Sequence, residues 1–142
     1  MFIGQHLSHR ACSWPWMARS LSPGLSLHLF DVQQHSHTLQ DSPLGVRAVD
    51  FTTAFPAGIN AAASFNRRLI RLRGLYMGRE HVGKGVNIAL GPMMNMGRVA
   101  EGGRNWEGFG ADPFLAGEAA YETILGMQQG GVVACAKHLV AK

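Results

Sequence analysis

The most chemically loaded stretch of the sequence is residues 102–113, which read GGRNWEGFGADP. Arg104 and Asn105 supply hydrogen-bond donors, and Glu107 supplies a carboxylate acceptor. Trp106 adds an aromatic face, and the glycines let the backbone turn sharply or approach another group closely. Two interpretations are open from this stretch alone: a ligand site, or an arginine–glutamate pair and a buried tryptophan that hold a long loop in place.

Further polar residues follow short apolar runs. Asp41 follows Leu39-Gln40, Gly91-Pro92 follows the run 86–90, and Lys137-His138 follows the run 132–136. Short apolar runs bounded by such residues predict buried strands, with Cys135 as a core residue of the last one. The carboxyl ends of parallel strands share one edge of a sheet, where ligands bind. We therefore expect the polar residues near these ends to gather there: Asp41, Arg47, Arg104, Lys137 and His138.

Two helices are predicted between these strands. The first begins at Ser64 as N-cap, ends at 83–85, and has an apolar face of Phe65, Leu69, Leu72 and Tyr76. Its arginines, which are Arg67, Arg68, Arg71 and Arg79, favour a solvated face over a patch for an anionic partner.

The second helix begins at Asp112 as N-cap with Pro113 at its first position, and ends at Gly130-Gly131. Its apolar face consists of Leu115, Ala119, Ile124 and Met127. The resulting order of strand, helix, strand, loop, helix and strand predicts an α/β protein with a parallel sheet and helices packed outside it.

Composition excludes several classes of protein. The 142 residues are 46% hydrophobic and 15% charged, which is typical of a globular domain. The net charge of +4 with scattered arginines does not indicate nucleic acid as a partner. Cys12 and Cys135 form no disulfide framework, and the seven histidines show no metal-ligand spacing, so neither a metal nor a cofactor is expected.

Residues 1–37 differ from the rest because they show neither helical nor strand periodicity. We expect an irregular segment, with only a weak strand signal where Leu25, Leu27 and Leu29 alternate with polar residues. Polar residues interrupt its start, so it does not resemble a signal peptide. No apolar run approaches the roughly 18 residues of a membrane-spanning helix, so no membrane partner is expected.

Five motifs occur together in a fixed order. They are LQDSPLGVR (39–47), AFPAG (54–58), LGP (90–92), GGRNWEGF (102–109) and AKH (136–138). In order and spacing they resemble the N-terminal part of a family-3 glycoside hydrolase of the fungal β-glucosidase type. The resemblance covers residues 39–138 of the 142.

The resemblance implies that residues 38–142 are the first strands and helices of a (β/α)8 barrel, truncated at the C-terminus, while residues 1–37 stay unassigned. It implies a secreted enzyme that degrades cellulose-derived sugars, removing terminal non-reducing β-D-glucosyl residues from cellobiose and related β-glucosides with retention. Its partner would be a β-glucoside or cello-oligosaccharide. The positions that match the family's glucose-holding residues in the −1 subsite are Asp41, Arg47, Leu90, Arg104, Lys137 and His138.

One departure from the family affects the expected activity. Retaining hydrolysis needs two carboxylates about 5 Å apart, and the family's nucleophile lies in a Ser-Asp-Trp-type motif that these 142 residues do not contain. No catalytic residue is therefore assigned. Two alternatives stay open: an inactive carbohydrate-binding remnant or non-functional fragment, and an unrelated phosphate binder that uses the turn at residues 102–104.

Overall fold

The computed structural model describes residues 38–139. The predictions for residues 1–37, including the weak strand signal at residues 25–29, concern a segment that lies outside the described residues, as does Cys12.

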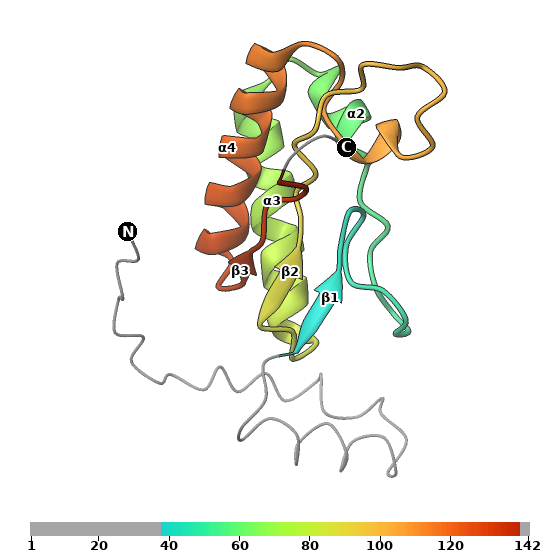
Figure 1. The fold of residues 1–142 in the computed structure, drawn as a ribbon. Helices are drawn as coiled ribbons and strands as arrows, with labels where there is room; N and C mark the ends of the chain where they lie inside the picture. Colours follow the sequence, from blue (N-terminus) through green and yellow to red (C-terminus); the bar gives the residue numbers. More distant parts are fainter. Residues whose placement is uncertain (1–37, 140–142) are drawn as a thin grey trace. The chain divides into compact units, whose positions relative to one another are not determined.

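Three short strands form a parallel sheet in the order β1-β2-β3 (Figure 1). They are β1 (Leu39–Asp41), β2 (Ile88–Leu90) and β3 (Val133–Ala134). In the register of the sheet, Asp41 lies opposite Leu90, and Ala89 lies opposite Ala134. The predicted parallel α/β arrangement is confirmed for this part of the chain.

The last two strands begin later than the apolar runs that predicted them. The amide of Val86 donates to the carbonyl of His81 (2.9 Å), and that of Val132 donates to the carbonyl of Met127 (3.4 Å). Both valines are buried. They therefore complete the turn that leaves each preceding helix, and only the residues after them join the sheet.

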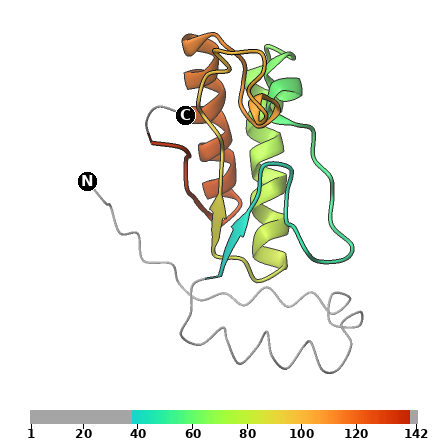
Figure 2. The ribbon, with the colours of Figure 1, turned by 45° about the vertical axis from the view of Figure 1, so that its right-hand side comes forward.

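Two 17-residue helices, α3 (Arg67–Gly83) and α4 (Pro113–Gln129), run side by side on one face of the sheet (Figure 2). Their backbones touch. A Cβ added at Gly74 would come 2.6 Å from the carbonyl oxygen of Thr123, and one added at Gly126 would come 2.2 Å from that of Arg71. Glycine is required at both positions because any side chain would push the helices apart.

This close contact makes the predicted apolar face of α3 wrong. Phe65, Leu69 and Tyr76 are exposed, and Leu72 is only partly buried. The buried residues are instead Ile70, Arg73, Gly74, Met77, Gly78 and His81. The buried face of α3 is set by small residues that let the two backbones touch. The spacing of its large apolar residues therefore does not predict which face is buried.

The start of α3 also differs from the prediction. The hydroxyl of Ser64 donates to the carbonyl of Ala61 (2.6 Å), so Ser64 follows the short helix α2 (Gly58–Ala62). The N-cap of α3 is Asn66, whose Oδ1 accepts from the amide of Leu69 (3.1 Å).

Part of the predicted solvated arginine face of α3 pairs with α4. Arg67 lies 2.8 Å from Glu118, and Arg71 lies 2.5 Å from Glu122. Arg68 and Arg79 are exposed, as predicted.

The predicted limits of α4 are confirmed. Asp112 is the N-cap, and its Oδ2 accepts from the amide of Leu115 (2.6 Å); Pro113 is the first residue, and Gly130 is the C-cap. Ala119 and Met127 are buried as predicted, whereas Leu115 and Ile124 are only partly buried. Met127 packs with Ala89 of β2 and Val132 in the core between α4 and the sheet.

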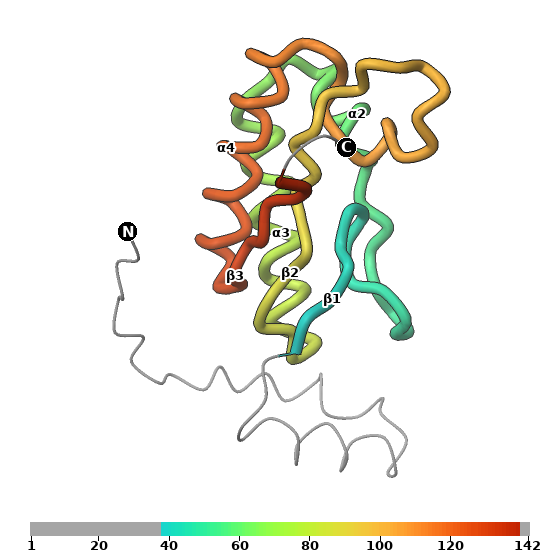
Figure 3. Tube along the Cα trace, viewed as in Figure 1, coloured from blue at the N-terminus to red at the C-terminus, as the bar shows by residue number. Residues whose placement is uncertain are grey.

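Two long loops follow the carboxyl ends of β1 and β2 (Figure 3). Residues 42–57 connect β1 to α2, and residues 91–112 connect β2 to α4 through the 3-10 helix η2 (Asn105–Glu107). A Cβ on Gly58 of α2 would lie 2.2 Å from the carbonyl oxygen of Glu107. The start of α2 therefore packs directly on η2.

Cys135 is exposed, so its predicted place in the core is wrong. The strand β3 ends at Ala134 at one edge of the described sheet, and Cys135 falls just beyond it. Within residues 38–139, no helix is long and apolar enough to cross a membrane.

Candidate functional site

Asp41, the last residue of β1, lies between two cations from distant parts of the chain. The Nζ of Lys137 donates to Oδ1 (2.7 Å), and NH1 of Arg47 donates to Oδ2 (3.2 Å). Each oxygen of the carboxylate thus has its own cation. The carboxyl ends of β1 and β3 meet here as predicted, because both strands run parallel to β2.

Backbone hydrogen bonds beyond the strands place Lys137. Its amide donates to the carbonyl of Pro92 (3.0 Å), and its carbonyl accepts from the amide of Met94 (2.8 Å). These bonds continue the pairing of β2 with β3 past their ends. The side chain of Lys137 is 12% exposed, and its Nζ also lies 3.4 Å from Oε2 of Glu107. Lys137 therefore bridges two carboxylates.

Glu107 connects this bridge to Arg104. Nε of Arg104 donates to Oε1 (2.5 Å), and NH2 donates to Oε2 (3.0 Å), so the pair is bidentate. Burial alone would raise the pKa of Glu107, but the hydrogen bonds from Arg104 and the charge of Lys137 bring it below its ordinary value. The bonds to Glu107 raise the pKa of Arg104 in turn. Both side chains are therefore ionised.

The structural interpretation of this loop holds in part: its arginine–glutamate pair is present, but its buried tryptophan is not. Trp106 is 41% exposed, whereas its neighbour Glu107 is buried. The carboxylate of Glu107 is engaged by Arg104 and Lys137, whereas Trp106 stays at the surface.

We call the five linked residues the ionic cluster: Arg47, Asp41, Lys137, Glu107 and Arg104. The hydrogen bond from Lys137 lowers the pKa of Asp41 against the opposing effect of burial, and the charges of Arg47 and Arg104 lower it further. The side chains of Arg47 and Asp41 are 61% and 45% exposed. The cluster consequently presents charged donors and an ionised acceptor to solvent.

His138 follows Lys137 and is held by Asn95. The Oδ1 of Asn95 accepts from the amide of His138 (2.6 Å) and lies 3.1 Å from its Nδ1, while Nδ2 of Asn95 donates to its carbonyl (3.2 Å). Because an amide oxygen can only accept, Nδ1 of His138 is the donor in this contact. Sequence reasoning missed Asn95, since a lone asparagine in a methionine-rich loop has no distinguishing spacing.

Leu90 completes the set of predicted site residues. It pairs with Asp41 across the sheet, so the two side chains point to the same face. The structure therefore brings Asp41, Arg47, Arg104 and Lys137 into one network, with Leu90 beside it and His138 next to Lys137 in the chain.

The cluster suits a ligand with many hydroxyl groups. An ionised carboxylate accepts from two neighbouring hydroxyls, and arginine and lysine donate to others through charge-assisted bonds. Asp41 and Glu107 both have lowered pKa values, so neither is a protonated acid at neutral pH. Among residues 38–139, no three histidine, cysteine, aspartate or glutamate side chains are grouped as they would be around a metal ion.

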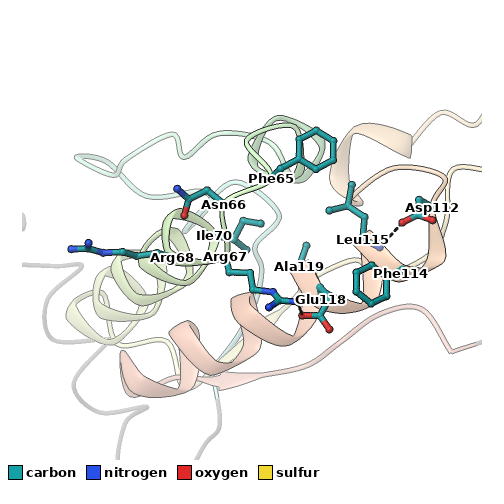
Figure 4. A pocket seen from close by; sticks show the side chains of 10 residues that line it. All are labelled: Phe65, Asn66, Arg67, Arg68, Ile70, Asp112, Phe114, Leu115, Glu118 and Ala119. Carbon is teal, nitrogen blue, oxygen red and sulfur yellow. Dashed lines mark hydrogen bonds and ion pairs between the residues drawn. The ribbon is translucent and has the colours of Figure 1, made fainter.

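A larger groove of about 760 Å³ lies elsewhere, between the starts of α3 and α4 (Figure 4). Apolar Phe65, Phe114 and Leu115 line it. Of its polar residues, Arg67 pairs with Glu118, and Asp112 caps α4. The predicted site residues do not line this groove, and its chemistry is less suited to a polar ligand.

A smaller hollow of about 290 Å³ is lined by residues 43–47 and 52–54 with Trp106, and it shares Arg47 with the ionic cluster.

Comparisons with known proteins agree with the motifs. The sequence model described as "Glycosyl hydrolase family 3 N terminal domain" matches residues 39–142. A "Probable beta-glucosidase E" of Aspergillus clavatus is 56% identical over 103 residues, which cover 72% of this chain and 10% of that protein. A "Probable beta-glucosidase" of Arthroderma benhamiae is 48% identical over 127 residues, covering 72% of this chain and 16% of that protein.

Solved structures show the same fold. A β-glucosidase from Chaetomella raphigera superposes with a TM-score of 0.74 at 46% identity, covering 79% of this chain and 16% of that one. β-Glucosidase 3B from Thermotoga neapolitana in complex with α-D-glucose gives a TM-score of 0.69 at 39% identity, covering 78% of this chain and 17% of that one.

The chain thus spans about a tenth to a sixth of the length of these relatives. The match nevertheless includes every described strand and helix, and it contains the whole ionic cluster. By its motifs, its fold and these relatives, the chain belongs to glycosyl hydrolase family 3, within the N-terminal domain of that family.

Proposed function

We propose that this chain carries the part of a β-glucosidase that holds the terminal glucosyl ring of a β-glucoside or cello-oligosaccharide. The −1 subsite would consist of Asp41, Arg47, Leu90, Arg104, Lys137 and His138. The observation that supports this most directly is Asp41 at the end of β1, held between Lys137 and Arg47 with both oxygens ionised and partly exposed.

The chemistry of the cluster fits a sugar ring. Asp41 would accept hydrogen bonds from two adjacent hydroxyls, and Lys137 and Arg104 would donate to others. Glu107 would keep these two cations in place, because it already engages both. A site that satisfies each hydroxyl rejects sugars in which one is missing or misplaced.

The proposal extends to the architecture of the enzyme. We infer that residues 38–142 form the first strands and helices of a (β/α)8 barrel in a secreted β-glucosidase that acts with retention on cellobiose and related β-glucosides. The relatives' names and the structure solved with glucose support the sugar class. The catalytic pair of carboxylates has no counterpart in the 142 residues, since they contain no Ser-Asp-Trp motif and both carboxylates of the cluster are paired with cations.

Titration of the purified 142-residue chain with glucose, followed by amide NMR, tests the sugar site. We expect saturable shifts at the ends of β1 and β3, and we expect Asp41→Asn and Lys137→Ala to weaken binding at least tenfold. Glu101→Gln, an exposed carboxylate in the same long loop as Arg104, is the matched control and should bind as the wild type does. No saturable binding, or equal binding by all four proteins, would refute the proposed sugar site.

An assay with an aryl β-glucoside tests catalysis. We expect the purified chain to release no more aglycone than its Asp41→Ala variant, because it holds the sugar but lacks the catalytic pair. Hydrolysis above that control would contradict this expectation.

A carbohydrate-binding remnant without activity is the second candidate, and it shares the sugar site. Protection of Trp106 fluorescence by glucose would favour it over a non-functional fragment. The phosphate-binding alternative is weaker, because the turn at residues 102–104 matches neither the GxxxxGK(S/T) nor the GxGxxG phosphate-binding pattern.

A further inference from the structure

The loop that carries Arg47 is held from outside by one face of α3. Residues 42–57 contain no helix or strand, and the bond from the amide of Phe55 to the carbonyl of Leu44 (2.9 Å) closes the loop on itself. Three side chains bond to the backbone of this loop: those of Arg73 and Glu80 in α3 and that of its C-cap, Lys84. Spacings of seven and eleven residues place the three on one side of a helix.

Arg73 joins the two ends of the loop. Its Nε donates to the carbonyl of Pro56 (2.7 Å), and its NH2 donates to the carbonyl of Pro43 (2.8 Å). The side chain is buried, and burial lowers its pKa to about 10, so the guanidinium remains charged at neutral pH. A charged donor with two carbonyl partners in a buried position ties them firmly.

Glu80 and Lys84 hold the middle of the loop. Oε1 of Glu80 accepts from the amide of Thr53 (2.9 Å), and Nζ of Lys84 donates to the carbonyl of Asp50 (2.9 Å). Together with the bonds of Arg73, these contacts fix the loop at both ends and on the side that follows Arg47.

The loop needs such support because two of its residues adopt an unfavourable backbone conformation. Ala48 and Phe51 have φ values of 59° and 57°, in the left-handed region that L residues other than glycine rarely adopt. Phe51 is 85% exposed, so burial of its own side chain does not hold this conformation. The bonds from α3 are the contacts that hold the loop in this shape.

We propose that Arg73 is a positioning residue that holds Arg47 against Asp41 through the loop, without touching the sugar itself. Release of the carbonyls of Pro43 and Pro56 would let the loop relax and withdraw Arg47 from the ionic cluster. This inference rests on the proposed sugar site for its effect on binding, but its structural consequence can be measured without a sugar.

The test uses the full 142-residue chain with Arg73→Met, which keeps length and burial but removes the donors. The control is Val132→Ala, which destabilises the buried core between α4 and the sheet, away from the loop. We expect Arg73→Met to accelerate exchange at the amides of Thr53 and Phe55 at least tenfold. It should also raise the pKa of the Asp41 carboxyl, followed by NMR, as far as Arg47→Ala does, and Val132→Ala should change neither.

Glucose binding supplies the coupled readout. Arg73→Met should weaken binding about as much as Arg47→Ala, and the double variant should be no weaker than Arg47→Ala alone, because both changes remove the same contact. If Arg73→Met does not fold, Glu80→Ala replaces it. We then expect the same changes in amide exchange, in the pKa of Asp41 and in glucose binding, each of them smaller.

Two results would overturn the inference: an Asp41 pKa that changes in Arg47→Ala but not in the α3 variant, or additive losses of glucose affinity. Failure of the wild-type chain to bind glucose would refute the sugar site instead. The exchange rates and the pKa of Asp41 would still decide the role of Arg73.

Discussion

At the scale of single residues, Glu107 is the more deeply buried of the two carboxylates in the ionic cluster. Its side chain is 4% exposed, and its two oxygens serve both Arg104 and Lys137. Asp41 also binds two cations, but it is far more exposed. We therefore expect replacement of Glu107 to lower mainly the stability of the fold, and replacement of Asp41 to lower mainly the affinity for the proposed sugar ligand.

Glu107→Gln should destabilise the chain by about 1–3 kcal/mol, because the amide leaves Arg104 and Lys137 without their buried negative partner. Exposure of Arg104 to solvent keeps the loss below that of a fully buried pair. Urea denaturation measures the change in the free energy of unfolding. Glu101→Gln, exposed in the same loop, should change it by less than 0.5 kcal/mol or so; equal effects of the two substitutions would contradict the role of Glu107.

Stability should fall at acidic pH for the same reason. The pKa values of Glu107 and Asp41 are lower in the folded protein than their ordinary values of 4.5 and 3.8. Their ionised forms thus favour folding; this contribution is complete above the ordinary values and is lost as the pH falls through the folded values. Urea midpoints between pH 7 and pH 3 should decrease below about pH 4.5, and the decrease should be smaller in Glu107→Gln.

At the scale of elements, contact between the backbones of α3 and α4 sets how the helices meet. Gly74 and Gly78 of α3 face Thr123, Gly126 and Met127 of α4. Helical periodicity correctly predicts that both helices exist, but it weighs only large apolar residues. It could not find an interface made by glycines, nor could it find that α3 also buries an arginine and a histidine.

Gly126→Ala should destabilise the chain strongly, because the new Cβ would meet the carbonyl oxygen of Arg71 at 2.2 Å and the amide nitrogen of Leu75 at 2.8 Å. We expect a loss of roughly 2 kcal/mol or more from such overpacking. Gly117→Ala is the control in the same helix, since its Cβ would meet nothing within 4 Å. It should gain up to about 1 kcal/mol from helix propensity. Thermal unfolding by circular dichroism compares the two; a neutral Gly126→Ala would show that the helices can separate freely.

At the scale of the whole molecule, the described sheet has helices on one face and two edge strands. β1 and β3 are those edges, and their exposed residues include Leu39 and Val133. Edge strands with exposed apolar side chains promote association between copies.

We therefore expect sedimentation velocity of the purified 142-residue chain to show self-association that increases with protein concentration. Val133→Lys should reduce the association, because a charge on an edge strand opposes pairing with another strand. A sedimentation coefficient that stays that of a monomer as the concentration rises would contradict this prediction.

The sequence alone determined the order of the three strands and the two long helices, the start of α4 at Asp112-Pro113 and the family, but not α2 or η2. These depend on local features: apolar runs, caps and ordered motifs, each of which acts over a few neighbouring residues. It also predicted which polar residues follow the strands, because a parallel sheet brings such ends to one edge. Arg104 and Glu107 could be paired in advance since they lie three residues apart in one loop.

Only the tertiary structure decided which contacts those residues make. The bridge of Lys137 between Asp41 and Glu107, the support of His138 by Asn95 and the bonds of Arg73 to the Arg47 loop join residues far apart in the chain. No spacing rule encodes such contacts, because they depend on how closely α3 and α4 pack and on where the two long loops meet. The sequence thus identifies the residues of the candidate site, whereas the packing of the helices and loops decides how they are arranged.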